Sequence, residues 1–262
     1  MQRKVNVPKQ MKKVKEHKCK EFSLTAGMLK GATEEGGKEE MNILLWGGRS
    51  KSRIIIEMVK EIYGTQAHIS GIFDKTLSEL PFQSDIELFS SGSELEVFCK
   101  KSSHYIVCIG GEHGYARYMT AKKLEEKGLL PLRVISQHSL LDKLDLIGGG
   151  IQVMPGAIAH KFSSINEQCI LNTNSTVDHE CIIGKGVHVM GGAAIAGRVT
   201  IGNYSTIGTN ATVLPNLVIG ENVYVGAGAV VTKNIGSNSV VAGVPAKFLR
   251  EFKPSIDLSM FS

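Results

Sequence analysis

The sequence predicts an α/β domain with a small parallel sheet, followed by a parallel β-helix. The β-helix follows from an unbroken period of six, because every sixth residue from Ile147 to Val231 is apolar and is often followed by glycine. An α-helix repeats every 3.6 residues, roughly, and cannot keep this period on one face. A hexapeptide period is typical of coils of about eighteen residues with three short strands each. The α/β domain follows from alternating strand and helix signals upstream.

The α/β signals extend over residues 41–135 and are typical of a Rossmann-like domain. Apolar runs predict strands over 42–46, 67–73, 104–109 and 131–135. Helical spacing predicts helices over 51–62, 93–101 and 115–127. Residues 136–146 are predicted to be a linker to the β-helix.

The anchors of the period are expected to point inward and to stack coil on coil in one aliphatic column. Fifteen anchors predict about five coils within residues 147–242, with residues 243–262 as a C-terminal cap and tail. The anchors are Ile147, Val153, Ala159, Ile165, Leu171, Val177, Ile183, Val189, Ile195, Ile201, Ile207, Val213, Ile219, Val225 and Val231.

Residues 1–40 carry ten Lys and Arg against six Asp and Glu, so +4 of the net charge of +5 lies in this segment. Few apolar residues and no period predict disorder and no catalytic role. A basic tail can contact nucleic acid or anionic lipid. We favour instead the interpretation that residues 1–40 are an upstream extension, or that they come from a start codon chosen too early, ahead of Met41. We expect no nucleic-acid partner.

Composition narrows the remaining classes of protein. No apolar run approaches about 18 residues, so no segment is expected to span a membrane, and no apolar stretch follows the basic N-terminus as in a secretory signal. The five cysteines are scattered, with no CxxC or His/Cys cluster, so we expect no metal. A reducing, cytoplasmic location is the expectation.

Two motifs carry a resemblance to a known family. Residues 172–189 read NTNSTVDHECIIGKGVHV, and residues 242–247 after the repeats read AGVPAK. With the Leu/Ile/Val-Gly-x4 pattern they resemble left-handed β-helix acyltransferases. Over residues 41–250 the chain is similar to the sugar acetyltransferases of the PglD and NeuD family. The left hand is implied by the resemblance alone, since the general rule for parallel crossovers predicts a right hand.

The resemblance implies an acetyl-CoA-dependent enzyme and a homotrimer with active sites between the prisms. Transfer to an amine or a hydroxyl needs a base, and histidine suits neutral pH. His179 matches the family's base, and Glu180 matches the carboxylate that raises its basicity. Because adjacent residues of a strand face opposite ways, the pair is expected at a corner of the coil.

Four further positions match the family's acetyl-CoA site. The resemblance implies that His188 contacts acetyl-CoA, and that small side chains line the slot for its pantetheine arm at Gly197, Thr209 and Ala227. The alternative for the last three is that they form ordinary corners of the β-helix. His160 matches no functional position and is interpreted as a surface residue.

The acceptor is expected at the carboxyl ends of the strands in the α/β domain. The candidate residues are Gly48, Arg49, Ser50, Lys51, Asp74 and Gly110. The N-terminus of a helix suits a phosphate, and basic side chains beside it add charge-assisted hydrogen bonds. A tight turn with solvated basic neighbours is the alternative.

The loop after the first strand departs from the relatives. It reads Gly-Gly-Arg-Ser-Lys where they usually have Gly-x-Ser/Gly-Gly-His, and Asp74-Lys75 stands where they often have Asp-Asp. Asp74 matches the residue that contacts the base of a nucleotide sugar in the relatives, whereas Arg49 and Lys75 depart. The nucleotide base therefore stays open.

The expected function is N-acetylation of a nucleotide-linked amino sugar for surface glycan biosynthesis, with His179 as the general base. One alternative is O-acetylation of a sialic-acid-like sugar, and another is a non-catalytic subunit that binds a sugar nucleotide. The γ-carbonic anhydrases share the hexapeptide repeat but need three metal-binding histidines. The sequence motif around His160, His179 and His188 argues against a carbonic anhydrase.

Overall fold

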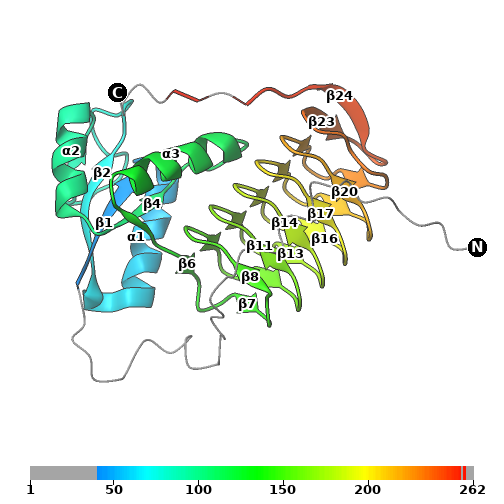
Figure 1. Ribbon diagram of the computed structural model, residues 1–262, viewed down its shortest axis with the longest axis horizontal. Coiled ribbons are helices and arrows are strands. Elements are labelled where there is room, and N and C mark those ends of the chain that lie inside the picture. Colours follow the sequence, from blue (N-terminus) through cyan, green and yellow to red (C-terminus); the bar gives the residue numbers. More distant parts are fainter. Residues whose placement is uncertain (1–39, 255, 258–262) are drawn as a thin grey trace, which may run out of the picture. The chain divides into compact units, whose positions relative to one another are not determined.

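The computed structural model describes residues 40–254 and 256–257 (Figure 1). An α/β domain comes first in the chain, and a stack of short parallel strands follows it. The disorder predicted for residues 1–40 falls, apart from residue 40, outside the described residues.

A parallel five-stranded sheet with the order β3-β2-β1-β4-β5 forms the centre of the α/β domain. Its strands are β1 (Met41–Trp46), β2 (Ala67–Phe73), β3 (Leu88–Phe89), β4 (His104–Val107) and β5 (Leu130–Pro131). Its helices are α1 (Ser50–Tyr63), the short 3₁₀ turn η2 (Gly64–Gln66), α2 (Gly92–Lys101) and α3 (Gly114–Glu126). The strand order reverses between β1 and β4, which is where ligands bind in open sheets of this kind.

The side chains of β1 alternate between two hydrophobic cores, as the pleat of a strand requires. Ile43 and Leu45 pack in a core that includes Ile55 and Val59 of α1. Leu44 lies in the other core, which α2 and α3 cover from the opposite face of the sheet. The α/β domain thus has helices on both faces of its sheet.

The β-helix consists of three sheets whose strands follow one another around each coil. Sheet I contains β6 (Val134–Ile135), β9 (Gln152–Val153), β12 (Ile170–Leu171), β15 (His188–Val189), β18 (Thr206–Ile207), β21 (Tyr224–Val225), β23 (Ser239–Ala242) and β24 (Lys247–Glu251). Sheet II contains β7 (Leu140–Leu141), β10 (Ile158–Ala159), β13 (Thr176–Val177), β16 (Ala194–Ile195), β19 (Thr212–Val213) and β22 (Val230–Val231). Sheet III contains β8 (Leu146–Ile147), β11 (Ser164–Ile165), β14 (Ile182–Ile183), β17 (Thr200–Ile201) and β20 (Val218–Ile219).

The register of the strands confirms the period. Ile158 pairs with Thr176, eighteen residues on, and Thr176 pairs with Ala194 in the next coil. The anchors form one continuous buried core, into which the thiols of Cys169 and Cys181 also pack. The corner residues repeat the same period in a left-handed backbone conformation, with φ between 53° and 63° from Phe162 through Asn222 for the residues other than glycine.

The β-helix begins earlier than the sequence analysis predicted. The strand expected over residues 131–135 is two strands, because β5 pairs within the α/β sheet and β6 pairs with β9 of the β-helix. The expected linker, residues 136–146, contains β7 and the start of β8, which pair with β10 and β11. The signal was present, since Ile135 and Leu141 continue the period of six upstream of Ile147.

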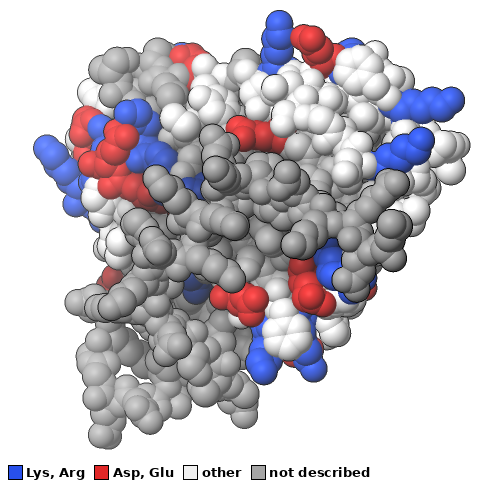
Figure 2. Space-filling model, turned by 45° about the vertical axis from the view of Figure 1, so that its right-hand side comes forward, with Lys and Arg blue, Asp and Glu red and all other residues white. Residues whose placement is uncertain are grey.

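At its other end, sheet I closes with the antiparallel pair β23 and β24. In the view of Figure 2, acidic and basic side chains lie interspersed over the described surface. Among the described residues, no helix combines the length and the apolar character that crossing a bilayer requires.

Candidate active site

His179 and Glu180 lie in a turn between β13 of sheet II and β14 of sheet III. Nδ1 of His179 lies 2.9 Å from Oε1 of Glu180. A carboxylate only accepts, so Nδ1–H is the donor and the lone pair is on Nε2. Glu180 has a φ of 58°, and this left-handed backbone at the corner lets two adjacent side chains meet. The pair can therefore accept a proton at Nε2.

Two neighbours shape this corner. The carboxylate of Asp178 accepts a hydrogen bond from the backbone N–H of His179 at 2.7 Å, which holds the turn. Gly197 lies one coil further on, and a Cβ atom there would be only 2.5 Å from Nε2 of His179. The sequence analysis missed Asp178, although an aspartate before a turn often hydrogen-bonds to the following backbone.

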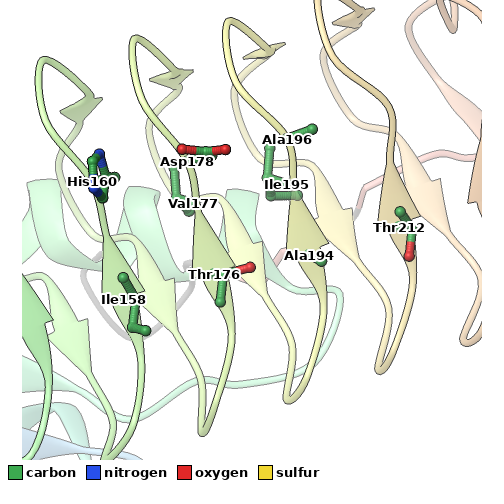
Figure 3. Close-up of a pocket in the computed structure, with 9 residues that line it drawn as sticks. All are labelled: Ile158, His160, Thr176, Val177, Asp178, Ala194, Ile195, Ala196 and Thr212. Atoms are coloured by element: carbon green, nitrogen blue, oxygen red, sulfur yellow. The ribbon is translucent and has the colours of Figure 1, made fainter.

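A shallow groove of about 280 Å³ lies on sheet II beside this corner (Figure 3). Successive coils contribute His160, Asp178 and Ala196 to its rim. The other lining residues, which are mostly small or apolar, are Ile158, Thr176, Val177, Ala194, Ile195 and Thr212. The groove offers an extended ligand a flat course along the coils, next to His179.

Thr209 and Ala227 are exposed and lie at the corner between sheets I and II. Gly197 lies at the corner between sheets II and III with His179. The predicted pantetheine positions therefore border sheet II from its two sides, and the groove lies between them.

His188 lies on sheet I and faces the α/β domain. Its side chain is buried, and its Nδ1 lies 2.9 Å from the carbonyl oxygen of Gly111. Burial, and then the charges of Arg117 and Lys51, lower its pKa to about 3. His188 is therefore neutral, with Nδ1–H donating to Gly111. Its predicted contact with acetyl-CoA stays a prediction.

Arg117 of α3 joins the α/β domain to the β-helix, and the sequence analysis did not single it out. The fully buried guanidinium donates to the carbonyl oxygens of Gln168 at 2.7 Å, Gly186 at 2.7 Å and Ile109 at 2.9 Å. Burial lowers its pKa to about 10, so it keeps its charge at neutral pH. A Cβ at Gly114 would be 2.2 Å from the oxygen of Gly186, so only glycine allows this approach.

The candidate acceptor residues gather where β1, β2 and β4 end. Asp74 accepts hydrogen bonds from Gly48 N at 2.9 Å and from both N and Oγ1 of Thr76. Burial alone would raise the pKa of Asp74, but these hydrogen bonds and the charge of Arg49 outweigh it and lower the pKa. Arg49 itself donates to Thr76 at 3.1 Å. Asp74 thus fixes the loop that leads into α1.

Ser50 and Lys51 form the start of α1, and the side chain of Lys51 runs along Gly110 after β4. A second cavity, of about 480 Å³, opens at the ends of β1 and β4. Its lining residues are Trp46, Ile109, Ala116, Thr120, Ile256 and Asp257. The six candidate residues therefore lie at or just after the carboxyl ends of β1, β2 and β4, where the sequence analysis expected the acceptor, and its binding there stays a prediction.

No group of three or more His, Cys, Asp or Glu side chains in residues 40–254 and 256–257 is arranged to hold a metal ion.

Comparisons with known proteins find a matching repeat family and solved structures with a similar fold. The family model for the bacterial transferase hexapeptide (six repeats) matches residues 180–215 and 198–233. WeeI from Acinetobacter baumannii AYE is 28% identical, over 80% of this chain and 100% of that one, with a TM-score of 0.69. PerB from Caulobacter crescentus, solved with CoA and GDP-perosamine, is 26% identical over 80% of this chain and 97% of that one, with a TM-score of 0.69.

The acetyltransferase domain of PglB from Neisseria gonorrhoeae FA1090 is 25% identical, over 80% of this chain and 100% of that one, with a TM-score of 0.69. In its repeat and its fold, the chain is similar to the hexapeptide-repeat sugar acetyltransferases. The left-handed β-helix and the enzyme class expected from the sequence are thus confirmed. A comparison of this acetyltransferase with curated protein sequences finds no match.

Proposed function

We propose that this acetyltransferase transfers the acetyl group of acetyl-CoA to the amine of a nucleotide-linked amino sugar, for surface glycan biosynthesis in the cytoplasm. The observation that carries the proposal is the corner at His179. There a half-exposed imidazole, held through Nδ1 by Glu180, presents its free Nε2 above Gly197.

The proposed reaction uses His179 as the general base. Nε2 removes a proton from the acceptor amine as the nitrogen attacks the thioester carbonyl carbon. The new N–C bond forms and the C–S bond breaks, and the proton is returned to the sulfur of the leaving CoA. Glu180 favours this sequence because its negative charge stabilises the imidazolium that forms.

The donor is proposed to lie along the groove of sheet II, since a flat course between small side chains suits an extended pantetheine arm. Gly197, Thr209 and Ala227 border this face, and PerB, of the same fold, was solved with CoA bound. Acetyl-CoA reacts at its thioester, so the acetyl carbon has to reach the end of the groove beside His179.

The acceptor is proposed to bind at the ends of β1, β2 and β4. The N-terminus of α1 and the basic side chains there suit a diphosphate. PerB was solved with GDP-perosamine, a nucleotide-linked amino sugar. Two structures of histidine variants of the Caulobacter enzyme, each 25% identical to this chain, also contain CoA and GDP-perosamine. An enzyme of this kind that acts on an amine fits these observations better than a sialic-acid O-acetyltransferase.

The test is a CoA-release assay with acetyl-CoA and a panel of nucleotide amino sugars, with free sialic acids as the second arm. We expect turnover with at least one nucleotide amino sugar and loss of that turnover in His179→Ala. Turnover with sialic acids alone would establish O-acetylation. A folded protein that binds sugar nucleotides without releasing CoA would be the non-catalytic subunit.

A further inference from the structure

Lys51 lies at the ends of β1 and β4 and has no acidic partner among the residues that the structure describes. It is the second residue of α1, and its Cδ would lie 3.8 Å from a Cβ at Gly110. Within residues 40–254, 256 and 257, no group forms a hydrogen bond or an ion pair with its Nζ. Its aliphatic part is therefore packed while its charge is left unpaired, which is unfavourable for a partly buried cation.

The groups around Lys51 add positive charge or none. Arg117 comes from α3, and its guanidinium donates hydrogen bonds to three backbone carbonyls. His188 comes from β15 and is neutral, because its pKa is lowered by burial and by the charges of Arg117 and Lys51. The thiol of Cys108, just after β4, is buried and stays protonated, since burial raises its pKa to about 12.

These surroundings set the charge state of Lys51. Burial first, and the charge of Arg117 second, lower its pKa to about 7, while Cys108 acts in the opposite direction. An anion bound next to Lys51 would compensate the positive charges of Lys51 and Arg117. A diphosphate fits the place, because Lys51 is the second residue of the fourteen-residue helix α1 and its side chain therefore starts in the first turn, where the helix N-terminus favours an anion.

We propose that Lys51 is the side chain that recognises the diphosphate of the nucleotide-sugar acceptor, and that the enzyme takes up one proton at Lys51 when this diphosphate binds. This inference rests on the proposed function for the identity of the acceptor. Beyond that function, Lys51 becomes a residue that determines acceptor specificity, and acceptor binding becomes dependent on pH.

The direction of the pH dependence follows from linkage. With a pKa of about 7, Lys51 is largely a neutral amine at pH 8 in the free enzyme. The bound diphosphate raises the pKa of Lys51, so binding at pH 8 draws a proton from solution. At pH 6 the ammonium already exists and little proton uptake occurs. Affinity therefore falls as the pH rises above 7, by up to about tenfold per pH unit.

Isothermal titration calorimetry tests the inference with GDP-mannose and UDP-N-acetylglucosamine as probes. Each titration is made at pH 6 and pH 8, in two buffers that differ in ionisation enthalpy. The diphosphate of these sugars is a diester and does not titrate in this range, so the buffer-dependent heat reports protons bound by the protein. We expect about one proton per site at pH 8 and close to none at pH 6.

Three variants separate Lys51 from other causes. Lys51→Arg keeps its charge at all pH values, so it should bind at pH 8 as well as at pH 6 and take up no proton. Lys51→Met should bind roughly tenfold more weakly at pH 6 and also take up no proton. The matched control is Lys60→Met, which removes an exposed lysine of the same helix, one that pairs with Glu57 at 3.0 Å. It should behave as the parent does, and thermal melting establishes that each variant is folded.

Two results overturn the inference while leaving the proposed function intact. One is tight probe binding without proton uptake at pH 8, and the other is unchanged binding and uptake in Lys51→Met. If neither probe binds but CoA release with a free sugar continues, the diphosphate site is absent and the inference also fails. Failure of CoA release with every nucleotide amino sugar instead contradicts the proposed function itself.

Discussion

The imidazole of His179 lies against Gly197, the residue eighteen positions further along the chain and one coil away. A Cβ atom at Gly197 would be 2.5 Å from Nε2, the nitrogen that is free to accept a proton. The φ of Gly197 is not positive, so its glycine is needed for space and not for backbone conformation. The eighteen-residue coil of the β-helix thus places Gly197 beside His179, and the absence of a side chain at Gly197 leaves room for the imidazole.

Gly197→Ala should lower turnover by about 10²-fold without unfolding the protein. The added methyl group forces the exposed end of the imidazole aside, and misplacing a reacting group by about 1 Å costs about 10²-fold in rate. The measurements are turnover and the midpoint of thermal unfolding. The matched control is Gly236→Ala, where a Cβ meets nothing within 4 Å. Equal turnover in the two variants would contradict the geometry described for His179.

His179→Ala should lower turnover by about 10²- to 10⁴-fold, the usual contribution of a positioned general base. Its side chain is 39% exposed, so the free energy of unfolding should change by less than about 1 kcal/mol. Glu180→Gln should give an intermediate rate, because it removes the charge that stabilises the imidazolium but leaves His179 in place. Near-normal turnover in a folded His179→Ala protein would leave the enzyme without its proposed base.

Asp74→Asn should raise the Michaelis constant for the acceptor and leave that for acetyl-CoA unchanged. The carboxylate holds Gly48 and Thr76, so the loop before α1 loses its shape when one of these hydrogen bonds fails. Steady-state kinetics with each substrate varied in turn makes the comparison. Equal damage to both constants would indicate general misfolding, and no change in either would move the acceptor elsewhere.

The same variant has a predictable dependence on pH. The pKa of Asp74 is lowered in the folded protein, so the charged carboxylate stabilises the fold above its unfolded value of 3.8. This contribution is lost as the pH falls through the lower folded value. The difference in unfolding temperature between the parent and Asp74→Asn should therefore be present at pH 7 and shrink below pH 3.8.

His188→Asn should make stability less sensitive to acid. His188 has a pKa of about 3 in the folded protein against 6.5 as the reference, so the unfolded chain binds more protons between these values. Stability must then fall as the pH drops below 6.5, by at most about 1.4 kcal/mol per pH unit from this residue. Melting curves from pH 7.5 to pH 4.5 should show a shallower fall in His188→Asn.

A homotrimer is the expected assembly. The outer row of sheet III exposes Leu146, Ile182 and Val218, by 37%, 51% and 46%, and a second copy of the chain can cover this row. Light scattering should give three times the mass of the chain, and the double variant Ile182→Glu with Val218→Glu should lower it. A stable parent monomer with full turnover would contradict this prediction.

The sequence by itself determined the periodic part of this protein. A hexapeptide period needs no distant information, since each anchor packs on the residues eighteen positions before and after it. The position of His179 and Glu180 at a corner followed from the same count. The order of the helices and of β1, β2 and β4 in the α/β domain followed from local hydrophobic patterns, with ends differing by one or two residues, whereas the short edge strand β3 was not predicted.

Only the tertiary structure decided how the two domains join. Whether residues 131–135 formed one strand or two depended on which sheet paired with each half, and pairing is not a local property of the chain. The same holds for Arg117, whose three carbonyl partners come from Ile109, Gln168 and Gly186. The neutral state of His188 and the lowered pKa of Lys51 depend on burial and on the charges that α1 and α3 bring to the same place. No single segment of the sequence contains that information.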